Sequence, residues 1–308
     1  MVAENPKVTV LLSVYNDQKF IGQAVESILG QSYRDFELLI IDDCSTDDTV
    51  EVINKYDDPR IRLIVNEENI DISKSLNKGL KLARGQYIAR QDSDDISISD
   101  RLLKQVKFLD DNPDIVAVGS RTEFIDAGGN HAGYWNQEVS SEEIFYALSY
   151  RCCLTSSSMV YRRKPIVQLG GYDESSSHAE DYELFYRISR KYKIYVIPYY
   201  LIRYRVRQDQ RLSKNYVPIS ERTFEIASRT GIDSGLLKFL LDRDDEKPLA
   251  ERLKLINRLH RFHAGLIQEA DKLGLSRLKM KSVCAKMMMI FIVKASIGKK
   301  GKKILKRA

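Results

Sequence analysis

The chain has 308 residues, of which 43% are hydrophobic and 30% are charged. This composition is typical of a globular protein with room for one large domain and an appendage, and it excludes a disordered or fibrous chain. The four cysteines show no C-x-x-C spacing, so the sequence indicates neither a zinc ribbon nor a disulfide framework. No stretch reaches the roughly 18 apolar residues that span a bilayer. Because the amino terminus is polar, we expect a cytoplasmic protein.

Positive charge is concentrated at the carboxyl end. The net charge is +6, but residues 272–308 contain ten lysines, two arginines and no acidic residue, so this segment carries +12 and the rest of the chain −6. An apolar run over 287–293 lies between Lys286 and Lys294. We therefore expect 272–308 to bind an anionic membrane surface, with its apolar run in the interface. Two alternatives are a packed core helix with solvated lysines and a tail that binds nucleic acid, although such tails rarely carry an apolar run.

Strands alternate with helices along the first 110 residues. Near-continuous apolar runs predict buried strands, and apolar residues at helical spacing predict the helices between them. The predicted elements are a strand over 8–14, a helix over 20–29, a strand over 36–41, a helix over 47–56, a strand over 61–65, a helix over 72–84, a strand over 87–91 and a helix over 102–109. This alternation implies an α/β fold with a mostly parallel, Rossmann-like sheet covered by helices on both faces.

Beyond residue 110 the predicted strands and helices no longer alternate regularly. The sequence predicts strands over 115–119 and 157–161 and a helix over 181–192. The segment Asn-Tyr-Val-Pro, which ends at Pro218, marks a boundary, and a helical stripe of apolar residues follows it. We therefore expect a domain over 1–215 and a helical, basic region over 216–308.

Polar residues follow three of the predicted strands. They are Ser13, Tyr15 and Asn16 on the first, Asp42 and Asp43 on the second, and Asp92, Ser93, Asp94 and Asp95 on the fourth. Because ligands of such sheets bind beyond the carboxyl ends of the strands, these groups should form one site. Clustered carboxylates repel one another unless a cation is present, and their oxygens suit Mg²⁺ or Mn²⁺ bound together with substrate phosphates. Alternation along an extended backbone would place Asp92 and Asp94 on one side and Asp95 elsewhere.

Five motifs follow one another along the chain. They are Ser13-Val-Tyr-Asn16, Ile41-Asp-Asp-Cys-Ser-Thr-Asp-Asp-Thr49, Arg90-Gln-Asp-Ser-Asp-Asp95, Gly170-Gly-Tyr-Asp173 and Glu180-Asp-Tyr-Glu-Leu184. In this order and spacing, residues 7–215 resemble the inverting family 2 glycosyltransferases, which have the GT-A fold. The third motif, with Ser75-Leu-Asn77 upstream, is similar to the branch that builds bacterial O-antigen, capsule and exopolysaccharide units. The resemblance implies transfer of a hexose or N-acetylhexosamine from a UDP-sugar, with inversion.

The resemblance also implies a role for each matched residue. Tyr15 would lie against the nucleobase with Ser13 nearby, Asp43 would accept the uracil N3–H, Asp92 and Ser93 would contact the donor, Asp94 would hold the Mn²⁺ or Mg²⁺ that bridges the diphosphate, and Asp181 would be the general base. Asp181 also has a plainer interpretation, as a first-turn acid of a helix. Family members often have a histidine near the end of the domain where this chain has Arg207, which could grip the diphosphate instead. They also often have glycine where Asp71 stands here.

The acceptor is less constrained than the donor. The family branch and the basic segment together suggest a polyprenyl-diphosphate-linked saccharide at the inner face of the cell membrane. Residues 128–137, which include Tyr134 and Trp135, form either a plain hairpin or a loop with sugar-stacking aromatic rings. Two other classes of function stay open: a nucleotide-binding module with a nucleic-acid-binding tail, and a non-catalytic scaffold.

Overall fold

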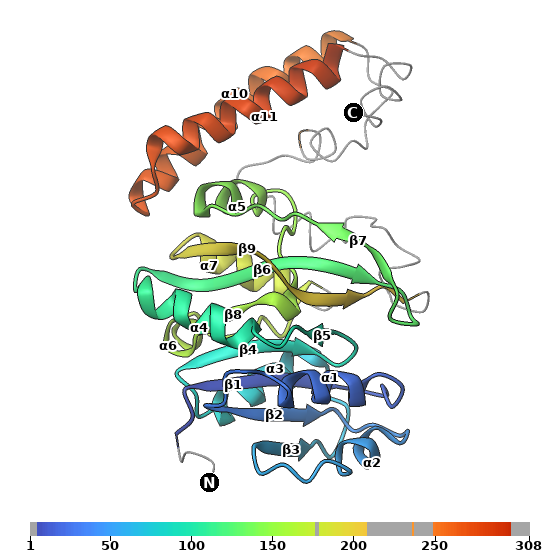
Figure 1. Ribbon diagram of the computed structural model, residues 1–308. Helices are drawn as coiled ribbons and strands as arrows, with labels where there is room; N and C mark the ends of the chain where they lie inside the picture. Colours follow the sequence, from blue (N-terminus) through green and yellow to red (C-terminus); the bar gives the residue numbers. More distant parts are fainter. Residues whose placement is uncertain (1–4, 176–178, 208–235, 237–248, 297–308) are drawn as a thin grey trace. The chain divides into compact units, whose positions relative to one another are not determined.

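The computed structural model describes residues 5–175, 179–207, 236 and 249–296. The chain divides into two compact units (Figure 1). The first combines residues 1–139 with 153–218, and the second combines 140–152 with 219–308. The sequence placed residues 140–152 in the first domain, whereas the structure packs them with the carboxyl-terminal helices. Residues 297–308, the last part of the predicted membrane-binding segment, lie outside the described residues.

A mixed sheet forms the first unit. Its strands are β1 (Val8–Val14), β2 (Phe36–Asp42), β3 (Ile61–Val65), β4 (Tyr87–Asp92), β5 (Ile96–Ser97), β6 (Ile115–Ile125), β7 (His131–Trp135), β8 (Val160–Arg162) and β9 (Lys193–Arg205). They lie in the order β3-β2-β1-β4-β8-β6-β9-β5, and β7 pairs with β6. The pairs among β1 to β4 are parallel as predicted, and β6 is parallel to β9, whereas β8 joins β4 and β6 antiparallel.

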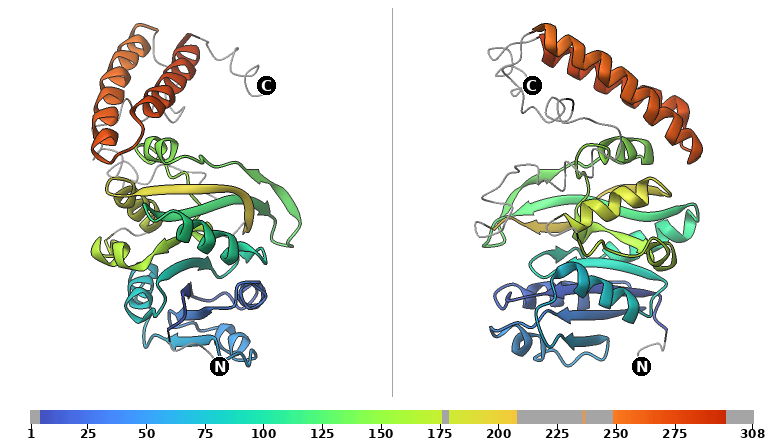
Figure 2. Two further views of the ribbon diagram at one scale, coloured as in Figure 1. Left: turned by 60° about the vertical axis from the view of Figure 1, so that its left-hand side comes forward. Right: turned by 180° about the vertical axis from the view of Figure 1, so that it is seen from behind.

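Helices cover both faces of this sheet (Figure 2). In the first unit they are α1 (Ile21–Leu29), α2 (Thr49–Ile53), α3 (Ile72–Leu82), α4 (Arg101–Asp111), α6 (Arg163–Gln168) and α7 (Glu180–Ser189). The apolar stripes of α1 and α4 share one core with Val8, Val10 and Leu12 of β1. On the opposite face, α3 approaches so closely that a Cβ on Gly79 would lie 2.2 Å from Leu11 Cδ1. The predicted α/β architecture is therefore confirmed.

The helix predicted over 47–56 is shorter in the structure. The Asp47 carboxylate accepts hydrogen bonds from the backbone N and the hydroxyl of Thr49, at 3.0 and 2.5 Å. This side-chain turn competes with helical hydrogen bonding, so α2 begins only at Thr49. The carboxylate of residue 47 thereby stays in the loop beyond β2.

The second unit is helical. It contains α5 (Ser141–Ala147), α10 (Leu249–Lys272) and α11 (Arg277–Ser296), which share an apolar cluster. Within it the Tyr146 hydroxyl lies 2.8 Å from His263 Nε2, and burial lowers the pKa of His263 to about 4. Met287 and Met288, at the start of the apolar run, are partly buried against the same cluster, while Met289 is exposed. No helix within the described ranges combines the length and the apolar character needed to cross a bilayer.

Candidate active site

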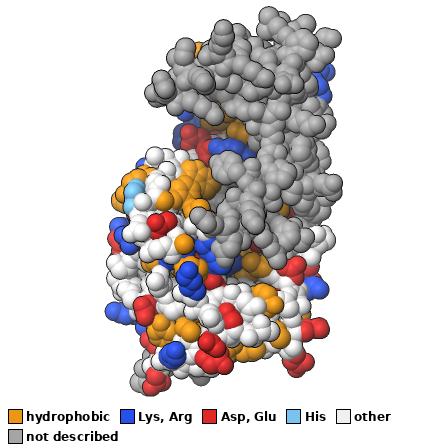
Figure 3. Space-filling view, turned by 90° about the vertical axis from the view of Figure 1, so that its right-hand side faces the viewer, with side chains coloured by type: hydrophobic (Ala, Val, Ile, Leu, Met, Phe, Trp, Pro, Cys, Tyr) orange, Lys and Arg blue, Asp and Glu red, His pale blue; other side chains and the backbone are white. Residues whose placement is uncertain are grey.

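The carboxyl ends of β1, β2 and β4 meet at one edge of the sheet. Ser13 is paired in register with Ile41 of β2 and with Asp92 of β4. The side chain of Tyr15, directly beyond β1, is 49% exposed, which leaves its ring accessible. Figure 3 looks onto this side of the molecule, where acidic and basic side chains are both scattered over the surface that is described. The predicted polar groups are thus brought together.

Left-handed backbone occurs at this edge on residues that are not glycine. Asn16, Cys44 and Asp71 have φ values of 50°, 65° and 77°. Such conformations cost about 1–3 kcal/mol each and persist only where surrounding contacts hold them. Asn16 is held by Ser45 and Thr46 across the edge: its backbone N lies 2.9 Å from Ser45 Oγ, and its Oδ1 accepts the Thr46 backbone N–H at 2.7 Å. The loops beyond β1 and β2 are therefore braced against each other.

Asp43 is buried and held at one oxygen. Its Oδ1 accepts hydrogen bonds from Asn66 Nδ2 at 2.8 Å, the Ile70 backbone N at 3.0 Å and Ser75 Oγ at 3.0 Å. None of the described residues donates to its Oδ2. Three donors fix the orientation of this carboxylate. The second oxygen is left to accept a hydrogen bond from a ligand.

The aspartate loop beyond β4 turns instead of extending. Asp92 pairs with the buried Arg90 at 2.6 Å and lies 2.5 Å from Ser157 Oγ, which also contacts Asp95. The side chains of Asp92 and Asp95 thus converge on one hydroxyl, and the expectation that Asp95 would face elsewhere is wrong because the backbone is not extended there. Burial, together with the negative charges of Asp94 and Asp92, raises the pKa of Asp95 well above its usual range.

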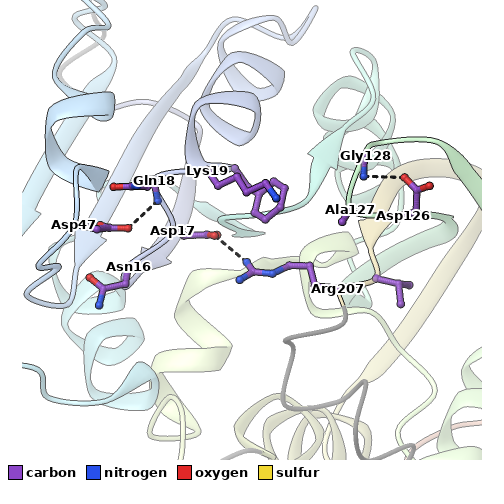
Figure 4. A pocket seen from close by; sticks show the side chains of 11 residues that line it. Asn16, Asp17, Gln18, Lys19, Asp47, Asp126, Ala127, Gly128 and Arg207 are labelled. Atoms are coloured by element: carbon purple, nitrogen blue, oxygen red, sulfur yellow. Dashed lines mark hydrogen bonds and ion pairs between the residues drawn. The ribbon is translucent and has the colours of Figure 1, made fainter.

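The side chain of Asp94 points toward Arg207, and not toward Ser157. Its Oδ2 lies 3.5 Å from an Arg207 guanidinium nitrogen, which is 2.8 Å from Asp17 Oδ1. The other oxygen of Asp17 accepts a hydrogen bond from Ser93 Oγ at 2.6 Å. A cavity of about 600 Å³ borders this cluster and is lined by Asn16–Phe20, Asp47, Asp126–Gly128, Val206 and Arg207 (Figure 4). Arg207 therefore stands at the wall of a cavity and next to the aspartate loop.

Asp181 lies in the first turn of α7, beside Glu180. Burial raises the pKa of Asp181, and the charge of Asp92 raises it further. Burial and the neighbouring Asp181 raise the pKa of Glu180 to about 7. Backbone N–H groups at the helix amino terminus act in the opposite direction on Asp181, but burial outweighs them. The effect of Asp92 on the pKa of Asp181 places these two residues, 89 positions apart in sequence, in one electrostatic environment.

Residues 170–172 connect α7 to α3. The Asn77 amide forms two hydrogen bonds with the Tyr172 backbone, at 2.9 Å to its O and 2.8 Å from its N. Gly171 has φ 70°, and a Cβ there would lie 2.4 Å from Asn77 Oδ1, so this position requires glycine. Arg187 of α7 donates to the Gly171 carbonyl at 2.6 Å. The Gly-Gly-Tyr motif thus connects the helix that carries Asp181 to α3.

Comparison with known proteins agrees with this geometry. Residues 9–170 match the family model described as Glycosyl transferase family 2. The chain belongs to this family. An uncharacterized glycosyltransferase of Methanocaldococcus jannaschii is 33% identical over 217 residues, which cover 68% of this chain and 75% of that protein. EpsE of Bacillus subtilis, named as a glycosyltransferase, is 44% identical over 118 residues, covering 37% of this chain and 42% of EpsE.

Solved structures show the same fold. Staphylococcus aureus TarS, in a crystal structure of its residues 1–349 with UDP-GlcNAc, matches with a TM-score of 0.61 and 19% identity. The match covers 94% of this chain and 90% of the TarS chain. This family 2 enzyme therefore has the predicted GT-A fold, and its five motifs lie on that fold as described above.

The donor set suits a divalent cation completed by a ligand. Within the described residues, no group of three or more His, Cys, Asp or Glu side chains could hold a metal ion alone. The raised pKa of Asp95, caused in part by the charges of Asp94 and Asp92, shows that carboxylates crowd one another in this loop. A cation would relieve this repulsion. Mg²⁺ and Mn²⁺ are commonly held by one or two carboxylates together with substrate phosphates, which is what this site can offer.

Several site residues were missed by the sequence analysis. Asn66 follows β3 and reaches Asp43, so the rule that polar groups follow strands could have found it. Asp17, which follows Asn16 beyond β1, could have been found by the same rule, whereas Ser157 gave no such signal. Ser157 bridges Asp92 and Asp95 from 62 to 65 residues away, and Asp17 joins Ser93 to Arg207. These contacts depend on the tertiary fold.

Proposed function

We propose that this family 2 glycosyltransferase transfers a hexose or N-acetylhexosamine from a UDP-sugar to a saccharide, with inversion at the anomeric carbon. The observation that carries the proposal is the convergence of Asp92, Asp94 and Asp181 at the edge where Asp43 also lies. The UDP and UDP-GlcNAc complexes of TarS support a UDP-linked donor. The partly free carboxylate of Asp43 suits the N3–H of uracil.

The proposed reaction is a single in-line displacement. Asp181 takes the proton of the acceptor hydroxyl while the oxygen of that hydroxyl attacks the anomeric carbon. The bond between the anomeric carbon and UDP breaks, and its electron pair leaves with UDP. A Mn²⁺ or Mg²⁺ ion held by Asp94 would neutralise the charge that develops on the leaving group. Ser13, Tyr15, Asp92 and Ser93 position the nucleoside end, and Arg207 contacts the diphosphate after leaving its partner Asp17.

A thermal-shift screen of nucleotide sugars tests the donor class. With Mn²⁺ present, a UDP-sugar at a hundredfold excess over its dissociation constant should raise the melting temperature by roughly 5 °C, because it binds the folded state only. GDP-mannose, the donor bound to the Pyrobaculum calidifontis mannosyltransferase, is the comparison ligand. An equal shift with GDP-mannose would contradict a uracil-specific contact at Asp43.

We further propose that the enzyme acts in bacterial surface-polysaccharide synthesis on a polyprenyl-diphosphate-linked acceptor. TuaG of Bacillus subtilis, named for teichuronic acid biosynthesis, is 41% identical over 106 residues, covering 34% of this chain and 42% of TuaG. The likeness to EpsE and TuaG supports a polysaccharide pathway. The exposed lysines on α11 suit the anionic inner face of a membrane.

Membrane binding through α11 is best tested by charge substitution. Deleting 272–308 would also remove the buried Met280 and Cys284 and so uncover the helical cluster. Replacing Lys279, Lys281 and Lys286 with glutamine keeps this packing and should weaken binding to phosphatidylserine vesicles about 100-fold, at roughly 1 kcal/mol per lysine.

The control makes the same change of charge elsewhere. Lys55, Lys81 and Lys107 are exposed in the first unit, and their replacement with glutamine should leave vesicle sedimentation unchanged. RNA binding is measured at the same salt concentration. If the two triple variants bind vesicles equally well, α11 is not the membrane-binding surface, and stronger binding to RNA than to vesicles would favour the nucleic-acid alternative.

A further inference from the structure

Tyr134 and Trp135 are neighbours in β7 but lie on opposite faces of the sheet. In the β6–β7 pairing Trp135 stands opposite Thr122, and Tyr134 stands opposite Glu123. Side chains alternate along a strand, so the two rings face different surroundings. Of the two forms that the sequence left open for residues 128–137, the structure has a hairpin between β6 and β7, and it places the two rings on opposite faces.

Trp135 belongs to a row of three rings that crosses three strands. Its ring stacks on Phe124 of β6, with centroids 6.3 Å apart and an angle of 11° between planes. Phe124 is paired with Tyr204 of β9, whose ring meets it edge-on at 6.0 Å. All three side chains are partly exposed. We call Phe124, Trp135 and Tyr204 the aromatic strip; two strand spacings give it a length of about 10 Å.

The inner end of the strip borders the aspartate loop. Ile96, directly after the aspartate loop, is paired with Arg203 of β9, and the backbone N–H of Arg205 donates to Asp95 Oδ1 at 2.9 Å, so the β9 backbone around Tyr204 lies against this loop. Burial and the charges of Asp92, Asp94, Asp95 and Asp181 together raise the pKa of Tyr204 far above its usual range. The strip therefore runs outward from the proposed site of reaction.

A glycine stands beside the strip. Gly133 is opposite Phe124 in the β6–β7 pairing, and a Cβ built on it would meet no atom of the described part of the chain within 4 Å. The residue directly opposite Phe124 on β7 thus adds no side chain beside its ring, and Trp135 contacts that ring from the diagonal position. A flat ligand could lie along the rings from Trp135 toward Tyr204.

We propose that the aromatic strip is the acceptor subsite, on which the terminal sugars of the acceptor saccharide stack. This inference rests on the proposed function and adds to it the surface that holds the acceptor. A pyranose ring has an apolar C–H face that packs on the electron-rich face of an aromatic ring, while its hydroxyl groups point outward. One end of the strip lies next to Asp94 and the other at Trp135, so a stacked saccharide would present its last hydroxyl toward the carboxylates.

Tyr134 supplies a matched control. On the other face its ring contacts those of His131 and Tyr200, with centroids 4.5 and 4.6 Å apart, and its side chain is 58% exposed. It is therefore an exposed aromatic residue of the same strand that lies on the other face of the sheet from the aromatic strip. Exposure alone would favour Tyr134 as the sugar-binding ring, whereas the proposal assigns this role to the strip that contains Trp135. Substituting each residue in turn therefore distinguishes the two.

The experiment uses the fluorescence of Trp135, the only tryptophan in the sequence. The full chain, saturated with UDP and Mn²⁺, is titrated with methyl glycosides of glucose, galactose and N-acetylglucosamine. We expect at least one glycoside to change the emission in a saturable way. The change should persist in Tyr134→Ala and weaken about tenfold in apparent affinity in Phe124→Ala.

Turnover gives the second measurement. The glycoside that most stimulates UDP release from the UDP-sugar should show a KM about tenfold higher for Trp135→Ala, with Trp135→Phe restoring most of the loss and Tyr134→Ala behaving as the parent enzyme. If Trp135 had a merely structural role, Trp135→Ala would lower the melting temperature, but its KM would not differ from that of Tyr134→Ala.

Each contrary result would lead to a different conclusion. If no glycoside alters the emission, or if Trp135→Ala and Tyr134→Ala have the same KM, the acceptor subsite is elsewhere. If a short-chain prenyl phosphate alters the emission and glycosides do not, the strip binds lipid and the inference is overturned. The UDP-sugar thermal shift is measured in parallel, because its absence would refute the proposed donor and not the subsite alone.

Discussion

Replacing Asp181 with asparagine should lower the transfer rate between about 100-fold and about 10,000-fold while leaving the affinity for UDP unchanged. Asparagine has nearly the same shape but cannot accept the proton of the attacking hydroxyl, and general-base catalysis contributes a factor of this size. The measurement is UDP release at saturating donor, together with UDP binding by calorimetry. A variant with normal turnover would return Asp181 to its plainer interpretation as a first-turn helix acid.

The pH dependence of the parent enzyme provides an independent check. A general base must be deprotonated, so the rate should rise with pH through the pKa of Asp181. Because burial and Asp92 raise this pKa, the rise should occur above the ordinary range of an aspartate. Glu180, with a pKa of about 7, is the competing base. If Glu180→Gln abolished turnover while Asp181→Asn did not, the two roles would have to be exchanged.

Replacing Asp94 with asparagine should weaken UDP binding in the presence of Mn²⁺ by at least about 100-fold. The amide removes the charged oxygen that would bind the cation, and changes around metal ligands commonly cost this much affinity. With EDTA instead of the metal, the variant should bind UDP as tightly as the parent enzyme or more tightly, since it lacks one carboxylate that repels the diphosphate. Calorimetric titration with and without the metal measures both states.

A distant aspartate distinguishes this effect from a general change of charge. Asp100 lies just before α4 and pairs with Lys104, so Asp100→Asn should bind UDP as the parent enzyme does. Comparison with Asp181→Asn is equally informative. If Asp94→Asn and Asp181→Asn weakened UDP binding to the same degree, the separation of metal binding from proton transfer would be wrong.

The amino-terminal half of the sheet was predictable because its signals are local. β1 to β4 are short, mostly apolar runs, and each predicted strand agrees with the observed bounds to within one residue. The rule that polar groups at the ends of parallel strands meet at one edge then located the site. Pairing of Ser13 with Asp92 confirms that juxtaposition.

The other half depends on distant contacts. β6 continues past the predicted end at Gly119 to Ile125, although Arg121 and Glu123 interrupt its apolar pattern, because pairing with β9 extends along its whole length. The Ser140–Glu143 capping box is a local signal for the start of α5. Which unit that helix joins could not be inferred, because its partners lie more than 100 residues later.

The membership of α5 in the helical unit has a consequence for how this enzyme can be divided or recombined. The polypeptide passes between the units at 139/140, at 152/153 and again at 218/219, so the carboxyl-terminal helices are not a detachable appendage. A fragment ending near residue 215 would leave Phe145, Tyr146 and Tyr150 bare to water and prone to aggregate. Chimaeras that exchange the helical unit between family members should therefore carry residues 140–152 with it.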